Sequence, residues 1–246
     1  AALPVPEQIA QAKRLVSKKA GTDARYIAYF QDYTNTYAPG DRLRRVFEAA
    51  ISQPEICALS IATRPDCLPP EILSLLRELR RQKPVWIELG LQTIHDSSAE
   101  YIRRGYPLYV YDEAVHTLRA CGIEVITHMI LGLPGETQEM MTQTAHHIGQ
   151  SGAAGIKLHL LHVLSGTDLA ADYAAGAFDT LPLDDYISAL EACLRVLPRH
   201  MVIHRMTGDG AKRDLIAPLW SADKKRVLNE INRRFLSDDL EQGSLL

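Results

Sequence analysis

Residues 85–93, VWIELGLQT, form a short and largely apolar run bounded by polar segments, and this run indicates the fold class. Runs of this length and composition are typical of strands that are buried on both faces of a parallel sheet. Similar runs occur on both sides of it, each separated from the next by a longer stretch with helical periodicity. The predicted strands lie at residues 25–31, 55–63, 85–93, 122–133, 155–164 and 201–207.

The segments between these strands show the periodicity of helices. A repeated strand–helix series predicts an α/β fold in which helices cover a parallel sheet, and six such units indicate a barrel or part of one. The chain opens on a helix, so we expect the first strand and loop of the series to be missing. The predicted helices lie at residues 6–20, 41–53, 69–82, 99–104, 109–121, 137–152, 184–197, 209–217 and 221–237.

Composition restricts the class of protein. The 246 residues fit about one large domain, and a net charge of -3 gives no support for a broad nucleic-acid surface. No apolar run approaches the roughly 18 residues that cross a bilayer. The first residues, AALPVPEQIA, lack the basic region, apolar core and cleavage site of a secretory signal. We therefore expect a cytoplasmic protein with reduced thiols and no membrane contact. The cysteines are Cys57, Cys67, Cys121 and Cys193, which form no CxxC, CxxxCxxC or zinc pattern.

Polar residues collect where the predicted strands end, which is the edge at which parallel barrels place active sites. Because side chains alternate along a strand, Glu88 and Gln92 share one face of their strand, and Lys157 and His159 share one face of theirs. A buried charge is costly without a partner. Two interpretations stay open: a structural ion pair of Glu88 with Lys157, or a polar ligand pocket to which Gln92, His128 and His159 contribute, which we favour.

Two strand ends carry glycine-rich turns. HRMTGDG, which begins at His204, places Arg205 where it either binds an anion or pairs with Asp209. LGLPGET, residues 131–137, lacks the lysine and the glycine spacing of a phosphate-binding loop. It offers a sharp turn whose Thr137 suits the start of a helix.

Seven strings between residues 25 and 235 resemble YhcC/YtqA-type radical SAM proteins. The core of that family is similar to those of the Elongator catalytic subunit and of oxygen-independent coproporphyrinogen oxidase. The resemblance implies a partial (β/α)6 TIM-like barrel over residues 1–208, lacking its first strand and cluster loop, with a helical extension over 209–246. In order, the strings are YIAYFQDYTNTYAP, SIATRPDCLP, WIELGLQTIHD, THMILGLPGET, IKLHLLHVLSGT, HRMTGD and LIAPLWSADKKRVLN.

The resemblance implies two cofactors, a 4Fe-4S cluster and S-adenosylmethionine (SAM). In the family a CxxxCxxC loop holds the cluster, which reductively cleaves SAM to a 5'-deoxyadenosyl radical that abstracts hydrogen from a substrate. An electron donor such as flavodoxin or ferredoxin is the implied partner. CxxxCxxC is absent here, so we expect the cluster ligands upstream of Ala1 and no activity from the chain as numbered. The substrate stays unknown; RNA is conceivable, but neither the charge nor a stacking motif supports it.

The resemblance also assigns site residues. Thr34 and Asn35 stand where relatives bind the SAM amino group, and Glu88 and Gln92 stand where they contact the ribose and carboxylate. Arg104 matches an arginine that pairs with the SAM carboxylate, which suits a planar two-donor fork. The other implied cofactor contacts are Arg64, His128 and Val163, and the expected substrate contacts are His159, His204 and Arg205.

Two other functions stay open. The first is a non-catalytic protein on the same scaffold that binds a tetrapyrrole or a nucleotide. The second is a cluster-free barrel enzyme that uses Lys157 as a Schiff-base nucleophile, since a lysine inside a strand can have a lowered pKa.

Overall fold

The computed structural model describes residues 3–16, 21, 23–208, 210 and 212–246. The chain separates into two compact units. The first unit holds Ala1–Gly90 and Tyr109–Ile126, and the second unit holds Leu91–Leu108 and Thr127–Leu246.

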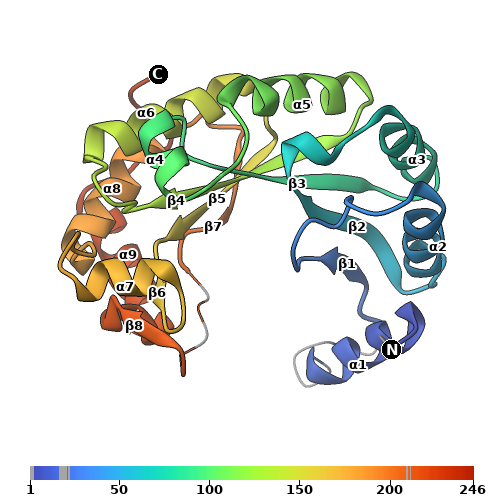
Figure 1. Ribbon diagram of the computed structural model, residues 1–246, viewed down its shortest axis with the longest axis horizontal. Coiled ribbons are helices and arrows are strands. Elements are labelled where there is room, and N and C mark those ends of the chain that lie inside the picture. Colours follow the sequence, from blue (N-terminus) through green and yellow to red (C-terminus); the bar gives the residue numbers. More distant parts are fainter. Residues whose placement is uncertain (1–2, 17–20, 22, 209, 211) are drawn as a thin grey trace. The chain divides into compact units, whose positions relative to one another are not determined.

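A six-stranded sheet in the order β1-β2-β3-β4-β5-β7 is the main sheet of the described residues (Figure 1). The pairs β1–β2, β2–β3 and β5–β7 are parallel. Parallel neighbours joined through helices confirm the predicted α/β class. The strands are β1 (Tyr26–Phe30), β2 (Ile56–Thr63), β3 (Val85–Gln92), β4 (Glu124–Leu131), β5 (Gly155–Leu160) and β7 (Val202–Arg205).

Helices occupy the intervals between strands, close to the predicted ranges. The hydroxyl of Thr137 accepts a hydrogen bond from the Met140 N–H and so caps α6, and Gly152 ends the helix with φ 85°. The helices are α1 (Val5–Val16), α2 (Gly40–Ile51), α3 (Pro70–Arg80), α4 (Asp96–Tyr101), α5 (Leu108–Ala120), α6 (Gln138–Ser151), α7 (Asp168–Ala174), α8 (Leu183–Arg195) and α9 (Lys224–Ser237), with 3-10 turns η1 (Pro65–Cys67) and η2 (Leu219–Ala222).

The core of the first unit lies between strands β1–β3 and helices α2 and α3, which lie side by side (Figure 1). Phe47 of α2 is fully buried and meets Phe30 of β1 edge to face, with ring centroids 5.0 Å apart. Such a pair adds about 0.5–1.5 kcal/mol to the burial of its apolar area. The amphipathic face of α2 therefore fixes the carboxyl end of β1.

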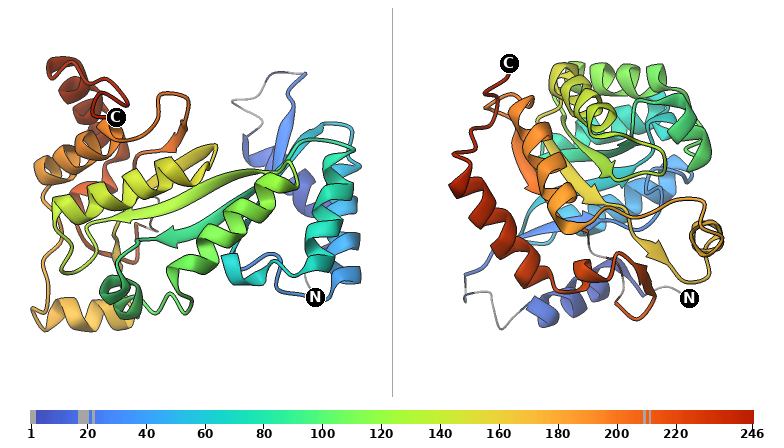
Figure 2. Two further views of the ribbon diagram at one scale, coloured as in Figure 1. Left: turned by 90° about the horizontal axis from the view of Figure 1, so that it is seen from above. Right: turned by 90° about the vertical axis from the view of Figure 1, so that its left-hand side faces the viewer.

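The core of the second unit includes the packed pair α6 and α8, seen from further sides in Figure 2. Tyr186 of α8 is fully buried, and its hydroxyl donates to the Met206 carbonyl at 2.8 Å. Burial raises the pKa of this phenol. The same tyrosine contacts the ring of Trp220, so α8 is tied to the segment that follows β7.

Two predicted elements are wrong. The predicted strand 155–164 divides into β5 and a separate strand, β6 (Val163–Leu164), which pairs antiparallel with β8 (Leu215–Ala217). The predicted helix 209–217 is contradicted by β8, and residues 209 and 211 lie outside the described part. Pro218 disfavours a helical conformation at Ala217, and the hydrogen bonds of β6 outweigh local propensity. Helix α7 was not predicted.

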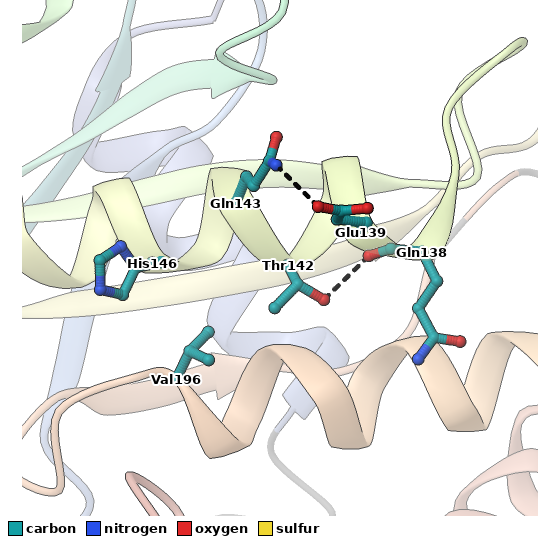
Figure 3. A pocket seen from close by; sticks show the side chains of 6 residues that line it. All are labelled: Gln138, Glu139, Thr142, Gln143, His146 and Val196. Carbon is teal, nitrogen blue, oxygen red and sulfur yellow. Dashed lines mark hydrogen bonds between the residues drawn. The ribbon is translucent and has the colours of Figure 1, made fainter. Parts of the chain in front are cut away.

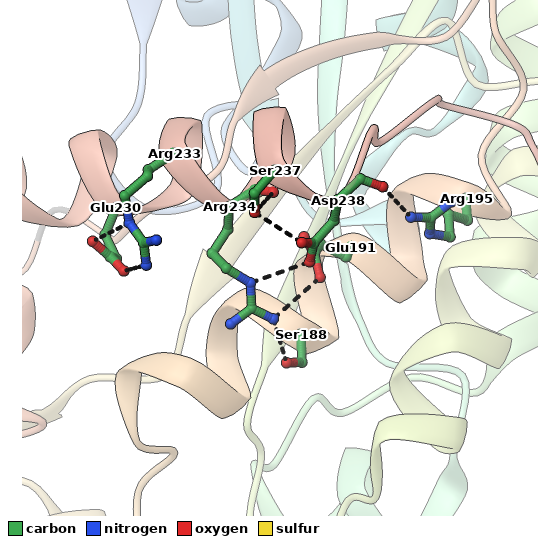
Figure 4. A network of polar contacts seen from close by, with 8 residues as sticks. All are labelled: Ser188, Glu191, Arg195, Glu230, Arg233, Arg234, Ser237 and Asp238. Carbon is green, nitrogen blue, oxygen red and sulfur yellow. Dashed lines mark hydrogen bonds and ion pairs between the residues drawn. The ribbon is translucent and has the colours of Figure 1, made fainter.

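A carboxylate pair joins α8 to the end of α9 (Figure 4). Glu191 is buried, and one of its oxygens lies 3.6 Å from the guanidinium of Arg234, which also bonds Asp238 at 3.2 Å. Burial, followed by the charge of Asp238, raises the pKa of Glu191. The hydroxyl of Ser237, followed by Arg234, lowers the pKa of Asp238. One arginine thus faces two carboxyl groups with opposite pKa shifts.

Glu191→Gln tests this pair. A carboxyl group with a raised pKa in the folded state stabilises the fold below its unfolded pKa, and this contribution is lost as pH rises through the folded value. Glutamine does not titrate, so the melting temperature of Glu191→Gln should gain a few degrees relative to the parent protein between pH 4.5 and pH 8. Thermal unfolding across this range checks the sign; a constant difference would contradict it.

Gly155→Ala tests the β5–β7 contact. A methyl group at this position would lie 2.6 Å from the His204 ring and 3.0 Å from the Val202 carbonyl oxygen. We expect the unfolding free energy to fall by about 1–3 kcal/mol, as for other overpacked sites. Gly40→Ala is the control in urea unfolding, because its nearest neighbour would be 4.0 Å away. Equal midpoints for the two variants would contradict the prediction.

Candidate functional site

Glu88 of β3 is a buried carboxylate that hydroxyl groups hold. It is 4% exposed, and its two oxygens accept hydrogen bonds from Tyr29 Oη at 2.7 Å and from Ser60 Oγ at 2.6 Å. The donors come from β1 and β2, whose parallel register brings them beside β3. These bonds offset part of the cost of burying the group. Glu88 is therefore held in one orientation by two strands.

The loop after β1 is anchored by Asn35. Its side-chain amide donates to the carbonyls of Phe30 at 3.0 Å and of Ala62 at 2.9 Å, while its backbone N–H also reaches Ala62. The Thr34 carbonyl accepts from the N–H of Tyr37 at 3.1 Å, which forms a turn. The side-chain nitrogen of Asn35 thus donates both of its hydrogen bonds to backbone carbonyls. A contact of Thr34 or Asn35 with the SAM amino group stays a prediction, and the side-chain oxygens of these residues would have to accept that bond.

Arg64, which follows β2, forms a two-bond pair with Asp66. Nε reaches one carboxylate oxygen at 2.9 Å and Nη2 reaches the other at 2.7 Å. The arginine hydrogen bonds hold the pKa of Asp66 below its usual value. Sequence reasoning missed this pair, although the RPD spacing of acid and base in a turn was a visible signal. A ligand anion at Arg64 would have to compete with Asp66.

In the second unit, Arg104 lies on the segment after α4 and is only 5% exposed. Nε donates to the Tyr106 carbonyl at 2.9 Å and Nη1 donates to the Thr93 carbonyl at 2.6 Å. The guanidinium carbon stands 5.0 Å from the centre of the Tyr106 ring. Nη2 is buried and has no hydrogen-bond partner among the described residues. The fork is thus fixed on one side and retains one unused donor.

Thr93 and Glu136 are polar residues of this region that sequence reasoning missed. Thr93 is fully buried, and its hydroxyl donates to Glu136 Oε1 at 2.5 Å while accepting from the His95 N–H at 3.1 Å. The other carboxylate oxygen of Glu136 is buried without a hydrogen-bond partner among the described residues. The acid in LGLPGET next to a sharp turn was the available signal. Gln92, a half-buried predicted cofactor contact, directly precedes Thr93.

The structure brings His128 and His159 together. They come from β4 and β5, and their ring centroids are 4.9 Å apart. This agrees with the expected convergence of polar side chains from these two strands. Both imidazoles are half-buried.

The remaining predicted residues lie on β6 and β7. Val163 is fully buried in β6, and Arg205 pairs in register with Lys157. His204 lies against Gly155, where any side chain would collide with it. The proposed partner Asp209 of Arg205 lies outside the described residues.

His162, which follows β5, packs its ring against two glycines, Gly208 and Gly210. Its Nδ1 accepts a hydrogen bond from the Gly210 N–H at 3.1 Å. A methyl group at Gly208 would come within 2.3 Å of the same ring, and one at Gly210 within 2.6 Å. The imidazole therefore lies directly against the backbone of Gly208 and Gly210.

Two hollows have other linings, although Tyr29, which donates to Glu88, borders the second of them. An open groove of about 440 Å³ is bordered by α6 side chains and by Val196 (Figure 3). A second space, of about 370 Å³, lies between α1 and β1. Neither includes a predicted site residue. No helix in the described part of the chain is long and apolar enough to cross a membrane.

The residues present fit the two expected cofactors differently. The spare donor of Arg104 suits a carboxylate such as that of SAM. A 4Fe-4S cluster is bound by several neighbouring thiolates, and the described residues include no close group of three His, Cys, Asp or Glu side chains. The four cysteines do not fit such a cluster, since they are free and widely spaced in sequence.

Two protein-family models together match most of the chain. A model of the radical SAM superfamily matches residues 2–148, and a model of the radical SAM C-terminal domain matches residues 153–236. The uncharacterized protein YtqA of Bacillus subtilis is 42% identical over 221 residues, covering 90% of this chain and 69% of its own length. Protein YhcC of Escherichia coli is 37% identical over 243 residues, covering 98% of this chain and 77% of its own length.

A solved structure shows the same fold. The archaeal Elp3 of Methanocaldococcus infernus, with an N-terminal deletion, matches 97% of this chain with a TM-score of 0.82 and 18% identity. This chain spans 60% of that protein. The likeness confirms the predicted partial TIM-like α/β fold. From the matching models and relatives together, the chain belongs to the radical SAM superfamily.

Proposed function

We propose that this chain forms the SAM-binding part of a radical SAM enzyme. The observation that carries the proposal is the buried guanidinium of Arg104, which has two donors fixed on backbone carbonyls and a third, Nη2, without a partner among the described residues. A buried donor left without a partner costs about 1–3 kcal/mol. A bound carboxylate would satisfy this donor and accept a strong, charge-assisted bond.

The other residues support binding of the rest of the ligand. Glu88 is oriented by Tyr29 and Ser60, so its carboxylate suits the hydroxyls of a ribose. Gln92 lies one residue from the Thr93 carbonyl that fixes Arg104. In this proposal Gln92 and Arg104 bind the amino-acid end of SAM.

When bound, SAM and a 4Fe-4S cluster would supply radical chemistry toward a substrate. The four cysteines of the sequence form no CxxxCxxC motif. What the chain contributes is binding and orientation. Beyond SAM, we propose that His159, His204 and Arg205 contact the substrate and that a flavodoxin or ferredoxin donates the electron.

Arg104→Ala is the direct test of this function. Loss of a hydrogen bond to a charged group should weaken SAM binding by about 1.5–3 kcal/mol, or roughly tenfold or more. Isothermal titration of the chain with SAM measures the effect, and circular dichroism confirms that the variant is folded. Arg119→Ala, an exposed arginine of α5, is the matched control. An unchanged SAM affinity in Arg104→Ala would remove Arg104 from the site and with it the main support for the proposal.

A further inference from the structure

The backbone at Gln92 has a conformation that is uncommon for a residue with a side chain. Its φ is 66°, and the Thr93 N–H donates to the Leu91 carbonyl at 2.9 Å across it. This bond closes a three-residue γ-turn, and the form with a positive φ at its centre is rare and strained. Such strain persists only where surrounding contacts enforce it, and it concentrates at functional sites.

The contacts that enforce this turn converge on Thr93. Its hydroxyl donates to Glu136 at 2.5 Å and accepts from the His95 N–H at 3.1 Å. The next N–H along the chain, that of Ile94, donates to the hydroxyl of Thr144 on α6 at 3.3 Å. The turn is thus fastened to the loop before α6 and to α6 itself.

The same turn sets the direction of the arginine. The Thr93 carbonyl accepts from Arg104 Nη1 at 2.6 Å, and the Tyr106 carbonyl accepts from Nε. A planar guanidinium held by two of its nitrogens has little freedom to rotate, so the position of the Thr93 carbonyl decides where Nη2 points. Rotation of the peptide between Thr93 and Ile94 would move that donor.

A contribution to stability does not explain why a glutamate occupies position 136. One of its oxygens accepts from Thr93, and the other is buried without a hydrogen-bond partner among the described residues. Burying an incompletely paired carboxylate is unfavourable, and an apolar group of similar volume often stabilises a protein at least as well.

We propose that Glu136, acting through the hydroxyl of Thr93, is a positioning residue that keeps the Gln92 turn closed and aims Arg104 at the carboxylate of SAM. This inference rests on the proposed function, because it assumes that Arg104 binds that carboxylate.

Thr93→Val tests the role, since it removes the hydroxyl with little change of volume and leaves the backbone carbonyl in place. We expect the Kd for SAM to rise about 3- to 10-fold, the effect of one buried hydrogen bond. Thr93→Ser retains a hydroxyl and should bind within about twofold of the parent. Thr142→Val, on α6, is the matched control.

A second ligand separates positioning from general damage. 5'-Methylthioadenosine has the nucleoside and sulfur of SAM but no amino-acid carboxylate, so its affinity should be unchanged in Thr93→Val. Hydrogen exchange should become faster at the amides of residues 93–95, with the melting temperature of the whole chain little changed. If Thr93→Val does not fold, Glu136→Leu is expected to weaken SAM selectively and Glu136→Gln to retain binding, because glutamine still offers an acceptor.

The outcomes distinguish the two proposals. If Arg104→Ala weakens SAM binding but Thr93→Val and Glu136→Leu do not, the positioning role is wrong and the proposed function stands. Equal weakening of SAM and methylthioadenosine would also overturn the positioning role. If Arg104→Ala leaves SAM binding unchanged, both proposals are wrong.

Discussion

Parallel pairing of short apolar strands is the constraint on which the rest of this structure depends. Two neighbouring strands that run in the same direction cannot be joined by a tight hairpin, so a crossover must return the chain to the start of the next strand. In the first unit α2 and α3 make these returns between β1, β2 and β3. As a result the loops that follow β1 and β2 leave from the same edge, and Asn35 can bind both strand ends at once.

Each of the two units buries a polar side chain that is predicted to contact the cofactor. Glu88 and Arg104 are both nearly inaccessible to water, and each is oriented by partners of fixed position. The hydroxyls on β1 and β2 hold Glu88, whereas backbone carbonyls hold Arg104. Preorganised groups of this kind lose little entropy when a ligand binds. Each of these two side chains is therefore held in place by its own partners.

Periodicity predicted the strands of the main sheet and most helices, because the apolar pattern of each segment matches its burial. It could not predict β8, where pairing with β6 across a long sequence separation outweighs the local preference of residues 215–217. Nor could it predict that Arg64 is engaged by Asp66. Periodicity also could not predict the hydrogen bond between Thr93 and Glu136. These residues are 43 positions apart, and only the folded chain brings them into contact.

The glycines that enclose His162 affect how the sequence can change over time. With the imidazole in this position, a methyl group at residue 208 or 210 would overlap the ring, so a side chain there requires the ring to move. If position 162 first became a small residue, both glycines would be released from that restriction. The three positions should therefore vary together, and a change at one alone would be selected against even where the other residues of the segment drift freely.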